Sequence, residues 1–468
     1  MSTQLDTAPA PIAATLDSVA APRSVFRTKL GFVLAAAGSA VGLGNVWRFP
    51  YFAATYGGGT FLFAYLLIAF VFGLTIMVTE IAIGRATGSS PLAAFGKISP
   101  KFKFVGVLAL AVPAIIFPYY SVIGGWVGRY AFSFLTGGGA AAAEAGYFGS
   151  FISGVWSPIF WLAVFIAFCA FFVALGVQKG IEKINLVGMP VFIVMLIALA
   201  AYGLTLPGAM DGFLHYVRPD FSELSVNTFI AATRQIFFSL SLSMGVMITY
   251  GSYLKKQQSI EKSSLQIAGV DTGVSLVAGA LVIPVVVAFM GVEGLGQGAG
   301  MLFVTIPQVF ALIPGGGFVG ALFFTLMFIA AATSGISLME PTVAALMEKT
   351  NWTRKKAALL IAVGSFALAM PTTLGFGVWN HIRIGHLDML GMMSFLTDTL
   401  LMPIVALLTA VMIGWVVGPK VIAAVVTDEG KRFRAEKVYT FVIKWIAPPA
   451  LVAIFASSLL LAFGVISL

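Results

Sequence analysis

The sequence predicts an all-α polytopic membrane protein, and three properties of the chain carry that prediction. Hydrophobic residues make up 59% of the 468 residues, charged residues make up only 10%, and the mean hydropathy is +1.00. The apolar residues gather in runs of about 20, the length that a helix needs to cross a hydrocarbon layer of ~30 Å. A soluble domain of this composition would expose too much apolar surface, so we expect the chain to lie in a membrane.

Eleven apolar runs are long enough to cross that layer. They cover residues 30–52, 60–84, 104–135, 157–177, 184–206, 228–253, 265–291, 317–347, 356–374, 388–418 and 438–466. Residues 211–223, between the fifth and sixth runs, are expected to form a polar outer loop. Residues 303–310 are apolar but too short to cross, and prolines and glycines flank them, so we expect a re-entrant or lid-like hairpin there.

Basic residues set the expected orientation. Most of the 27 lysines and arginines fall on one side if the N-terminus is cytoplasmic, so the positive-inside rule places the N-terminus inside and the C-terminus outside. Residues 1–22 are rich in Ala, Pro, Ser and Thr without a basic start, so we expect a disordered cytoplasmic tail and not a signal peptide. Short terminal regions and the lack of a glycosylation sequon in the expected outer loops favour a bacterial inner membrane.

Several function classes are disfavoured by composition. The net charge of +9 does not indicate a nucleic-acid partner, because the basic residues lie in segments between the spans. Cys169 is the only cysteine, which excludes an intramolecular disulfide. His215, His381 and His386 fall in connecting segments, so no zinc site is expected.

The first span contains an interruption at residues 38–50 (GSAVGLGNVWRFP). Glycines and a serine are poor helix formers, so we expect the helix to break. Lipid cannot satisfy the freed N–H and C=O groups, whereas a cation on the carbonyls and a carboxylate on the amides could. Asn45 and Arg48 are costly in hydrocarbon unless they face a cavity or a partner. The alternative is a small-residue packing face from Gly38 to Gly42.

This stretch closely resembles the first transmembrane helix of the neurotransmitter:sodium symporters, the LeuT-fold family. The resemblance rests on V-G-L-G-N-x-W-R-F-P at residues 41–50, and continues through the glycines at 57–59 and E-I-A-I-G-R at 80–85. It implies two five-helix repeats in inverted topology with helices 1 and 6 broken. The polar residues of S-L-S-L-S-M-G at 239–245 match the second break. The implied organisation is a tail at 1–22, a first repeat at 23–227, an inverted repeat at 228–418, and a loop with an eleventh helix at 419–468.

The resemblance implies two sodium sites, both built from oxygen ligands that suit Na⁺. The first would use the Ala40 carbonyl, the Asn45 side chain, the Ser239 hydroxyl and carbonyl, and Asp271. The second would use the carbonyls of Gly38, Val41 and Ala330 with the hydroxyls of Thr333 and Ser334. Adjacent hydroxyls in a helix of small residues support the second site. The alternative is that each hydroxyl bonds the carbonyl four residues earlier.

A substrate site is implied as well. A substrate carboxylate would lie on the amides of Leu43 and Gly44, at the N-terminus of a half-helix, and on the Tyr120 hydroxyl. Relatives that carry monoamines have aspartate where this chain has Gly42, so the glycine implies an amino acid. The pocket walls carry no charge, so we expect a neutral, hydrophobic side chain. The substrate set is completed by Ala40, Ile116, Ile123, Phe238, Ser239, Ser241, Met244, Ser334 and Leu338.

An outer gate would cover this pocket. Arg48 is the central gate residue, and Gln235 and Phe238 match the other family positions. Relatives pair the arginine with an aspartate on span 10, but Ser394 stands in that register here. Asp398 lies one turn deeper, so we expect Arg48 to be held less firmly, with Asp398 or water as a substitute contact.

Inner contacts are implied by R-x-x-F at residues 23–26, which resembles the family's R-x-x-W latch. Arg23 and Phe26 would form the latch, and Glu348 would be the partner of Arg23, with ordinary juxtamembrane charge as the alternative. Glu80 is expected to bond backbone amides near the breaks. For Glu340 the sequence leaves freed backbone and solvent both open as partners.

Asp271 stands where chloride-dependent relatives have asparagine, and Ser275 follows on the same helix face. Two cations and one substrate carboxylate leave a net positive charge that needs an anion. A fixed aspartate can be that anion, so no chloride is expected. After sodium leaves, the carboxylate could carry a proton outward, and the alternative is a sodium ligand alone.

Together these residues predict a sodium-coupled symporter that takes up a neutral amino acid by alternating access. A membrane enzyme is disfavoured, because no H-E-x-x-H or G-x-S-x-G motif lies inside the spans. A channel would need continuous rings of pore-lining residues, and a channel or an amino-acid sensor of the same fold remains the alternative. The expected partners are the amino acid and membrane lipid; the sequence fixes neither the preferred amino acid nor the oligomeric state.

Overall fold

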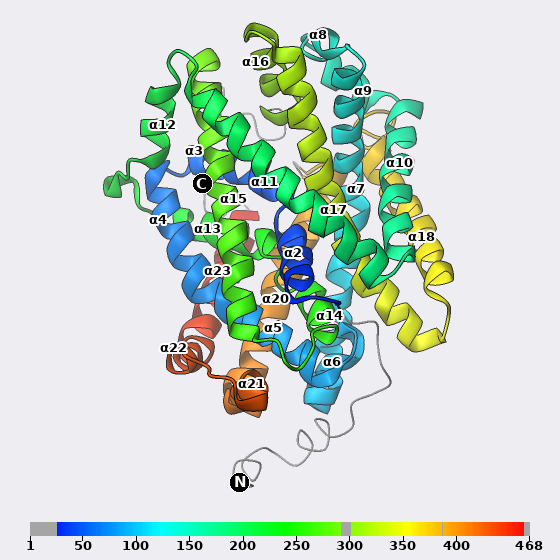
Figure 1. Ribbon diagram of the computed structural model, residues 1–468, viewed down its shortest axis with the longest axis vertical. Helices are drawn as coiled ribbons and strands as arrows, with labels where there is room; N and C mark the ends of the chain where they lie inside the picture. The colour runs from blue at the N-terminus through cyan, green and yellow to red at the C-terminus, as the bar shows by residue number, and fades with distance from the viewer. Residues whose placement is uncertain (1–25, 292–300, 386, 463–468) are drawn as a thin grey trace.

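The computed structural model describes residues 26–291, 301–385 and 387–462, and all its named elements are helices (Figure 1). Nine of the described helices are long and apolar enough to cross a membrane. They run Gly59–Thr87, Pro100–Leu135, Trp156–Ala174, Val177–Leu204, Ile260–Met290, Gly316–Thr350, Arg354–Leu374, Met389–Val417 and Glu436–Ser457. Each falls on one of the predicted spans. The expected tail at 1–22, Arg23, His386 and the last residues of the eleventh span lie outside the described residues.

Two of the predicted spans are broken, and these are the first and the sixth. In the first, α2 (Lys29–Ala40) is followed by a π-helical turn at Gly44–Arg48 and by α3 (Phe49–Thr55), and its two halves are bent by 51°. In the sixth, α13 (Val226–Ser239) ends six residues before α14 (Val246–Ser252) begins. Both breaks were predicted from glycines and serines inside apolar runs.

The second break has an unusual backbone. Ser241 and Ser243 have φ values of 51° and 61°, and Gly245 follows at 66°. A left-handed residue other than glycine costs about 1–2 kcal/mol, so contacts must hold these serines in place. The Ser243 amide donates to Glu80 Oε1 at 2.8 Å, the role predicted for Glu80, and the Ser241 hydroxyl donates to the Ser39 carbonyl at 3.1 Å.

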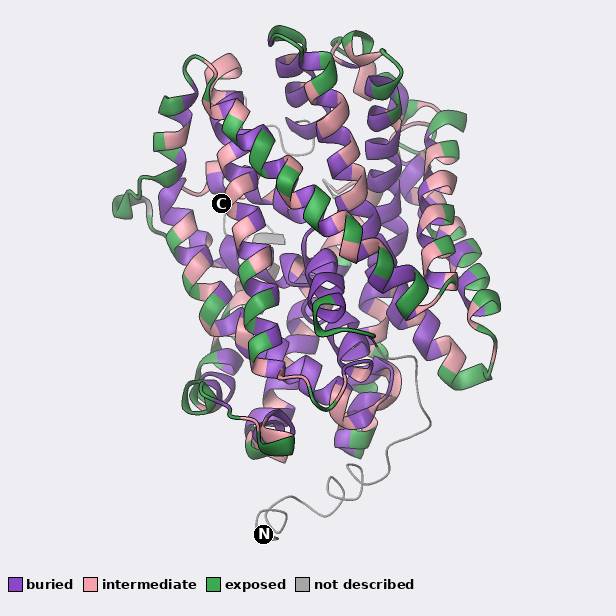
Figure 2. Ribbon diagram, in the orientation of Figure 1, coloured by how far each residue is buried: buried purple, intermediate pink, exposed green. Residues whose placement is uncertain are grey.

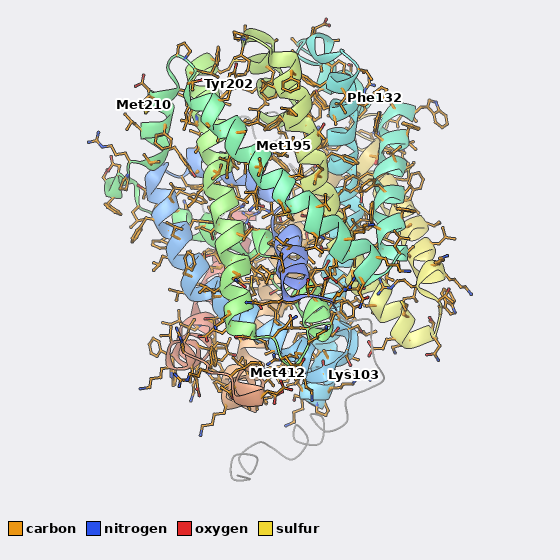
Figure 3. The ribbon with its side chains drawn as sticks, in the orientation of Figure 1. Lys103, Phe132, Met195, Tyr202, Met210 and Met412 are labelled. Atoms are coloured by element: carbon orange, nitrogen blue, oxygen red, sulfur yellow. The ribbon has the colours of Figure 1, made fainter. Side chains whose placement is uncertain are left out.

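The broken helices lie inside the bundle. Every residue from 31 to 40 on α2 is buried, and α2 is purple near the centre of Figure 2, whereas the surrounding helices show pink and green on their outer faces. α17 (Gly316–Thr350) packs against α2, α7 (Lys103–Leu135) and α11 (Lys183–Leu204). α7 runs almost the full height of the molecule, from Lys103 to beyond Phe132 (Figure 3).

Exposed apolar side chains cover the outer helices. Phe160 and Phe171 on α10 (Trp156–Ala174) are each 59% exposed, and Leu359 on α18 (Arg354–Leu374) is 66% exposed. An exposed apolar surface of this kind is stable only against lipid, which agrees with the predicted membrane location.

Short helices occupy the segments between the spans. They are α6 (Pro91–Ile98), α8 (Gly139–Ala142), α9 (Tyr147–Ser153), α12 (Ala209–Val217), α16 (Ile306–Leu312) and α21 (Lys420–Thr427). The expectation of a polar loop at 211–223 was therefore wrong over its first half, because α12 has an apolar face that packs on α15 (Ile260–Met290). The apolar segment at 303–310 forms a short helix, Met301–Leu312.

A close approach between α5 (Leu74–Thr87) and α14 gives the first testable prediction. A Cβ at Gly84 would lie 1.9 Å from the Ile248 carbonyl oxygen, and neither backbone can yield without moving a helix. Gly84→Ala should therefore destabilise the fold by about 1–3 kcal/mol, seen as a lower melting temperature in detergent. Gly364→Ala, on α18 with no atom within 4 Å, is the matched control. Equal melting temperatures for the two variants would contradict this packing.

Candidate functional site

A small cavity lies where the two breaks face each other. This central cavity has a volume of about 20 Å³, enough for one water molecule. Its walls come from both broken spans, from α7 and from α17, and consist of Ser39, Ala40, Gly42, Leu43, Gly44, Ile116, Tyr120, Phe238, Ser241, Met244, Ser334 and Leu338. Most of the wall is apolar, and among the residues that the structure describes no carboxylate or amine lines it.

Gly42 and Tyr120 define the polar end of the central cavity. A Cβ at Gly42 would lie 2.4 Å from the Ser334 hydroxyl oxygen and 3.1 Å from the Tyr120 hydroxyl oxygen, so only glycine leaves room there. The Tyr120 hydroxyl is buried and has no hydrogen-bond partner among the residues that the structure describes. A buried unpaired hydroxyl is costly, and here it faces a space that a ligand oxygen could enter.

The central cavity contains most, but not all, of the predicted substrate residues. Ile123 lies elsewhere, because it is one helical turn beyond Tyr120 on α7, about 4.5 Å further along the axis. Ser239 does not line the cavity either, since its hydroxyl points to Asp271. Ser39 was not predicted; its hydroxyl lies 3.1 Å from that of Ser241 and joins the two breaks.

A polar cluster surrounds Asp271, behind the first break. The carboxylate is fully buried and accepts hydrogen bonds from Asn45 Nδ2 at 2.7 Å and from the Ser239 hydroxyl at 2.7 and 2.9 Å. Tyr65 also donates to it, at 3.4 Å, and Ser275 accepts from Asn45 at 2.8 Å. The structure thus brings together the three side chains expected at the first sodium site, and Tyr65 is an addition that the sequence did not indicate.

The hydroxyls of α17 face the first break in a second cluster. The Ser334 hydroxyl oxygen lies 3.2 Å from each of the carbonyl oxygens of Gly38, Ser39 and Val41, and its single proton can be donated to any one of them. The Thr333 hydroxyl instead donates within its own helix, to Ile329 at 3.1 Å and to Ala330 at 3.0 Å. The back-bonding alternative therefore describes Thr333, while Ser334 makes the contacts between helices.

A larger cavity of about 250 Å³ adjoins the central one. Phe238, Leu43, Gly44 and Tyr120 line both. The remaining walls of this gate cavity are Trp47, Arg48, Tyr51, Phe52, Tyr119, Ile123, Arg234, Leu390, Ser394 and Asp398. Ile123, expected in the substrate pocket, thus lies here. The predicted outer-gate residues Arg48, Phe238, Ser394 and Asp398 line one space.

Arg48 contacts Asp398, one of the two substitute partners expected from the sequence. Its Nη1 donates to Asp398 Oδ2 at 2.9 Å, and its guanidinium lies 4.9 Å from the Phe238 ring centre, a cation–π distance. Residues 395–401 form π-helical turns. Ser394 lies four residues before Asp398, and its hydroxyl donates to the same carboxylate oxygen at 3.1 Å.

Gln235, the other predicted gate residue, has a different contact. It is fully buried, and its Nε2 donates to the Gly44 carbonyl at 3.0 Å. That contact satisfies one of the backbone groups that the first break exposes, so Gln235 supports the break itself.

Aromatic and charged contacts lie at the opposite end of α2. Phe26 is completely buried, donates through its amide to the Tyr253 carbonyl and packs edge-on against Phe32, Tyr250 and Tyr253. Arg23 lies outside the described residues, and Glu348, its expected partner, accepts a hydrogen bond from the Ser90 amide at 3.0 Å.

The partner of Glu340, which the sequence left open, is a charged side chain. Its carboxylate is fully buried and forms a two-pronged salt bridge with Arg354, at 2.7 and 2.8 Å. Tyr253 also donates to it, at 2.8 Å.

Comparisons with known proteins agree on one family. The family model described as the sodium:neurotransmitter symporter family matches residues 23–140 and 152–463. The uncharacterized sodium-dependent transporter YhdH of Bacillus subtilis is 33% identical, over 92% of this chain and 96% of its own length. An uncharacterized sodium-dependent transporter of Methanocaldococcus jannaschii is also 33% identical, over 85% of this chain and 82% of its own.

A solved structure resembles the fold closely. MhsT in complex with L-phenylalanine superposes with a TM-score of 0.86 and 36% identity. The match covers 93% of this chain and 100% of MhsT.

The Arg48–Asp398 contact gives the second prediction. Asp398→Asn removes the charge that holds Arg48, so the gate cavity should open more often. A cysteine at Leu390, which lines that cavity, should then react with a thiol reagent several-fold faster. Ser394→Ala removes one hydrogen bond to the same carboxylate but leaves the ion pair between Arg48 and Asp398 intact, so it should change the rate less than about twofold. A rate unaltered by Asp398→Asn would show that the contact does not restrict access.

Proposed function

The chain belongs to the sodium:neurotransmitter symporter family and is a sodium-dependent symporter with the LeuT fold, and we propose that its solute is a neutral, hydrophobic amino acid. It is a polytopic membrane transporter and not an enzyme. The observation that carries the proposal is the central cavity: two helix breaks and one unpaired tyrosine hydroxyl face an apolar space that carries no charge.

The polar end of the cavity suits an amino-acid carboxylate. The first N–H groups of a helix have no acceptor in that helix, and the helical dipole favours an anion there. Leu43 and Gly44 stand at such a helix start and line the cavity. Tyr120 would donate its free hydroxyl to the same carboxylate, and Gly42 leaves the space that a side chain would fill.

The apolar end suits an apolar side chain. Ile116, Phe238, Met244 and Leu338 surround it, and they offer no partner for a second charge. L-phenylalanine, the ligand in the similar structure, is bound by MhsT, and it supports the same solute class here. Because the cavity is about 20 Å³, Met244 would have to move aside for such a side chain, and methionine is compliant enough to do so.

Two sodium ions would be carried with the solute, on the two polar clusters. Asp271, Ser239 and Asn45 supply hard oxygen donors for one. Asn45 would have to turn its amide oxygen toward the ion, since its nitrogen now faces Asp271. The Gly38 and Val41 carbonyls, which already converge on Ser334, would serve the other with Thr333 and the Ala330 carbonyl.

The energetics allow strong accumulation. Each sodium ion contributes ~2.3 kcal/mol per 100 mV of membrane potential and ~1.4 kcal/mol per tenfold gradient. Two ions thus supply about 7 kcal/mol, which corresponds to about 10⁵-fold accumulation of a neutral solute.

Alternating access would use the contacts at the two ends of α2. Arg48, Asp398 and Phe238 would separate the solute from the outside, and Phe26 would separate it from the inside.

We propose a bacterial inner membrane with the N-terminus in the cytoplasm and the C-terminus outside, and an inverted relation between residues 23–227 and 228–418. A sensor of the same fold would bind the solute without flux, so flux measurements separate the two functions.

Asp271 makes chloride unnecessary in this proposal. It is a fixed, buried negative charge beside the proposed first sodium site, and it balances the cations that chloride would otherwise balance. When sodium leaves, a proton could replace it on the carboxylate for the return step, giving proton counter-transport.

The sodium prediction is tested by uptake into proteoliposomes across a panel of amino acids. Uptake of a neutral amino acid should need Na⁺, and Asn45→Ala and Thr333→Ala should each lower it at least tenfold. Thr350→Ala is the matched control, because its hydroxyl contacts only the Leu346 carbonyl at an exposed helix end. Uptake that persists when choline replaces Na⁺ would contradict the sodium sites.

The chloride prediction uses the same assay. Wild-type uptake should be equal in chloride and gluconate media, whereas Asp271→Asn should depend on chloride, because the fixed anion is then gone. An inwardly acidic pH gradient should stimulate wild-type uptake if a proton returns on Asp271. Wild-type uptake that stops in gluconate would contradict the charge argument, and uptake that ignores internal pH would remove only the proton step.

A further inference from the structure

One charged residue of the gate cavity is not used by the transport cycle proposed above. Arg234 lies on α13, next to Gln235, and lines the gate cavity with Arg48 and Asp398. Its Nε is buried and has no hydrogen-bond partner, and no salt bridge to it exists among the residues that the structure describes. A buried N–H group without a partner is costly, so the position of Arg234 calls for an explanation.

Asp398 forms no salt bridge with Arg234 among the described residues, and both of its carboxylate oxygens accept hydrogen bonds from other groups. Oδ2 accepts from Arg48 at 2.9 Å and from Ser394 at 3.1 Å. Oδ1 accepts from Thr397 at 3.1 Å and from Tyr119 at 3.5 Å. Among the described residues of the wall, two arginines and one aspartate are charged, so this part of the cavity carries one net positive charge.

We propose that Arg234 is a specificity-determining residue: its unpaired guanidinium makes the gate cavity a charge filter that rejects cationic solutes. This inference goes beyond the proposed function and rests on it only for the route, in which solutes pass the gate cavity before they reach the central one. Among the described residues, the central cavity has no carboxylate to hold the second ammonium group of a cationic solute. Rejection at the central cavity alone would still let cationic solutes enter and occupy the gate cavity. A positive charge in an enclosed space acts earlier, because low-dielectric walls strengthen its field.

The filter explains why an arginine is tolerated at this position. A neutral amino acid carries a carboxylate that is attracted to Arg234 and an ammonium group that is not, so it can enter with its carboxylate leading. Lysine or arginine brings an extra positive charge into the same field and is repelled. Two guanidiniums with one carboxylate thus select by charge, while the walls of the central cavity select by shape.

The local charge can be measured without transport. Leu390→Cys, in a Cys169→Ser background, places one thiol on the gate cavity wall. Its reaction rates with a cationic and an anionic methanethiosulfonate reagent are compared in liposomes at about 10 mM salt, where screening is weak. One unit charge about 8 Å away in water changes each rate about 2.4-fold in opposite directions. Arg234→Gln should therefore raise the cationic-to-anionic rate ratio about fivefold or more, and Arg234→Glu should raise it further.

Arg218→Gln is the matched control, because Arg218 is exposed just before α13 and does not line the cavity. It should leave the ratio unchanged. A ratio that is equal in Arg234→Gln and the parent, or one that Arg218→Gln shifts as much, would overturn the charge filter.

A second measurement connects the charge to selectivity. Excess L-lysine should inhibit uptake of the neutral amino acid several-fold more strongly in Arg234→Glu than in the parent. Equal inhibition would overturn the selective role. If the reagent ratio shifts as expected but no variant and no parent shows sodium-dependent uptake, the proposed function fails while the measured charge of the cavity stands.

Discussion

The structure depends on one constraint, which is that backbone N–H and C=O groups inside a membrane must find partners. The first and the sixth spans are broken at their centres, where backbone groups lose their partners within the helix, and surrounding side chains bond several of these groups. Gln235 bonds the Gly44 carbonyl, the Ser334 hydroxyl lies within hydrogen-bond distance of three carbonyls of the first break, and Glu80 accepts from the amide of Ser243. The buried Tyr120 hydroxyl has no partner among the described residues and lines the central cavity, which is the proposed binding site.

Much of the fold could be predicted because membrane helices are strongly patterned. The apolar runs gave the spans, and the serines and glycines gave both breaks, since these residue types destabilise a helix wherever they stand. Most of the central cavity followed from the resemblance at residues 41–50, because a long motif fixes the register of neighbouring helices. The presence of the short helices α12 and α16 did not follow, since short amphipathic segments have weak patterns.

Not every feature of the site could be predicted from the sequence. Ile123 was expected in the substrate pocket but lines the adjoining gate cavity, because the sequence does not show where one cavity ends and the next begins. The contact between Arg48 and Asp398 was one of two alternatives, since the sequence alone does not give the reach of two side chains across helices. Tyr65 and Ser39 were missed because each is an ordinary residue in its own helix and gains meaning only from the helix beside it. Arg234 was missed although a charged residue inside a predicted span is itself a signal of function.

The small volume of the central cavity has a consequence for solutes of increasing size. Phe238 forms part of its wall and also lies under the guanidinium of Arg48, 4.9 Å from it. A solute that fits by moving Met244 leaves this stack intact, and the carrier can close over it. A bulkier solute would have to displace Phe238, and the displaced ring would hold Arg48 away from Asp398. Such a molecule would bind but keep the outer gate from closing. On the proposed function, smaller amino acids would then be transported, whereas larger ones would act as inhibitors.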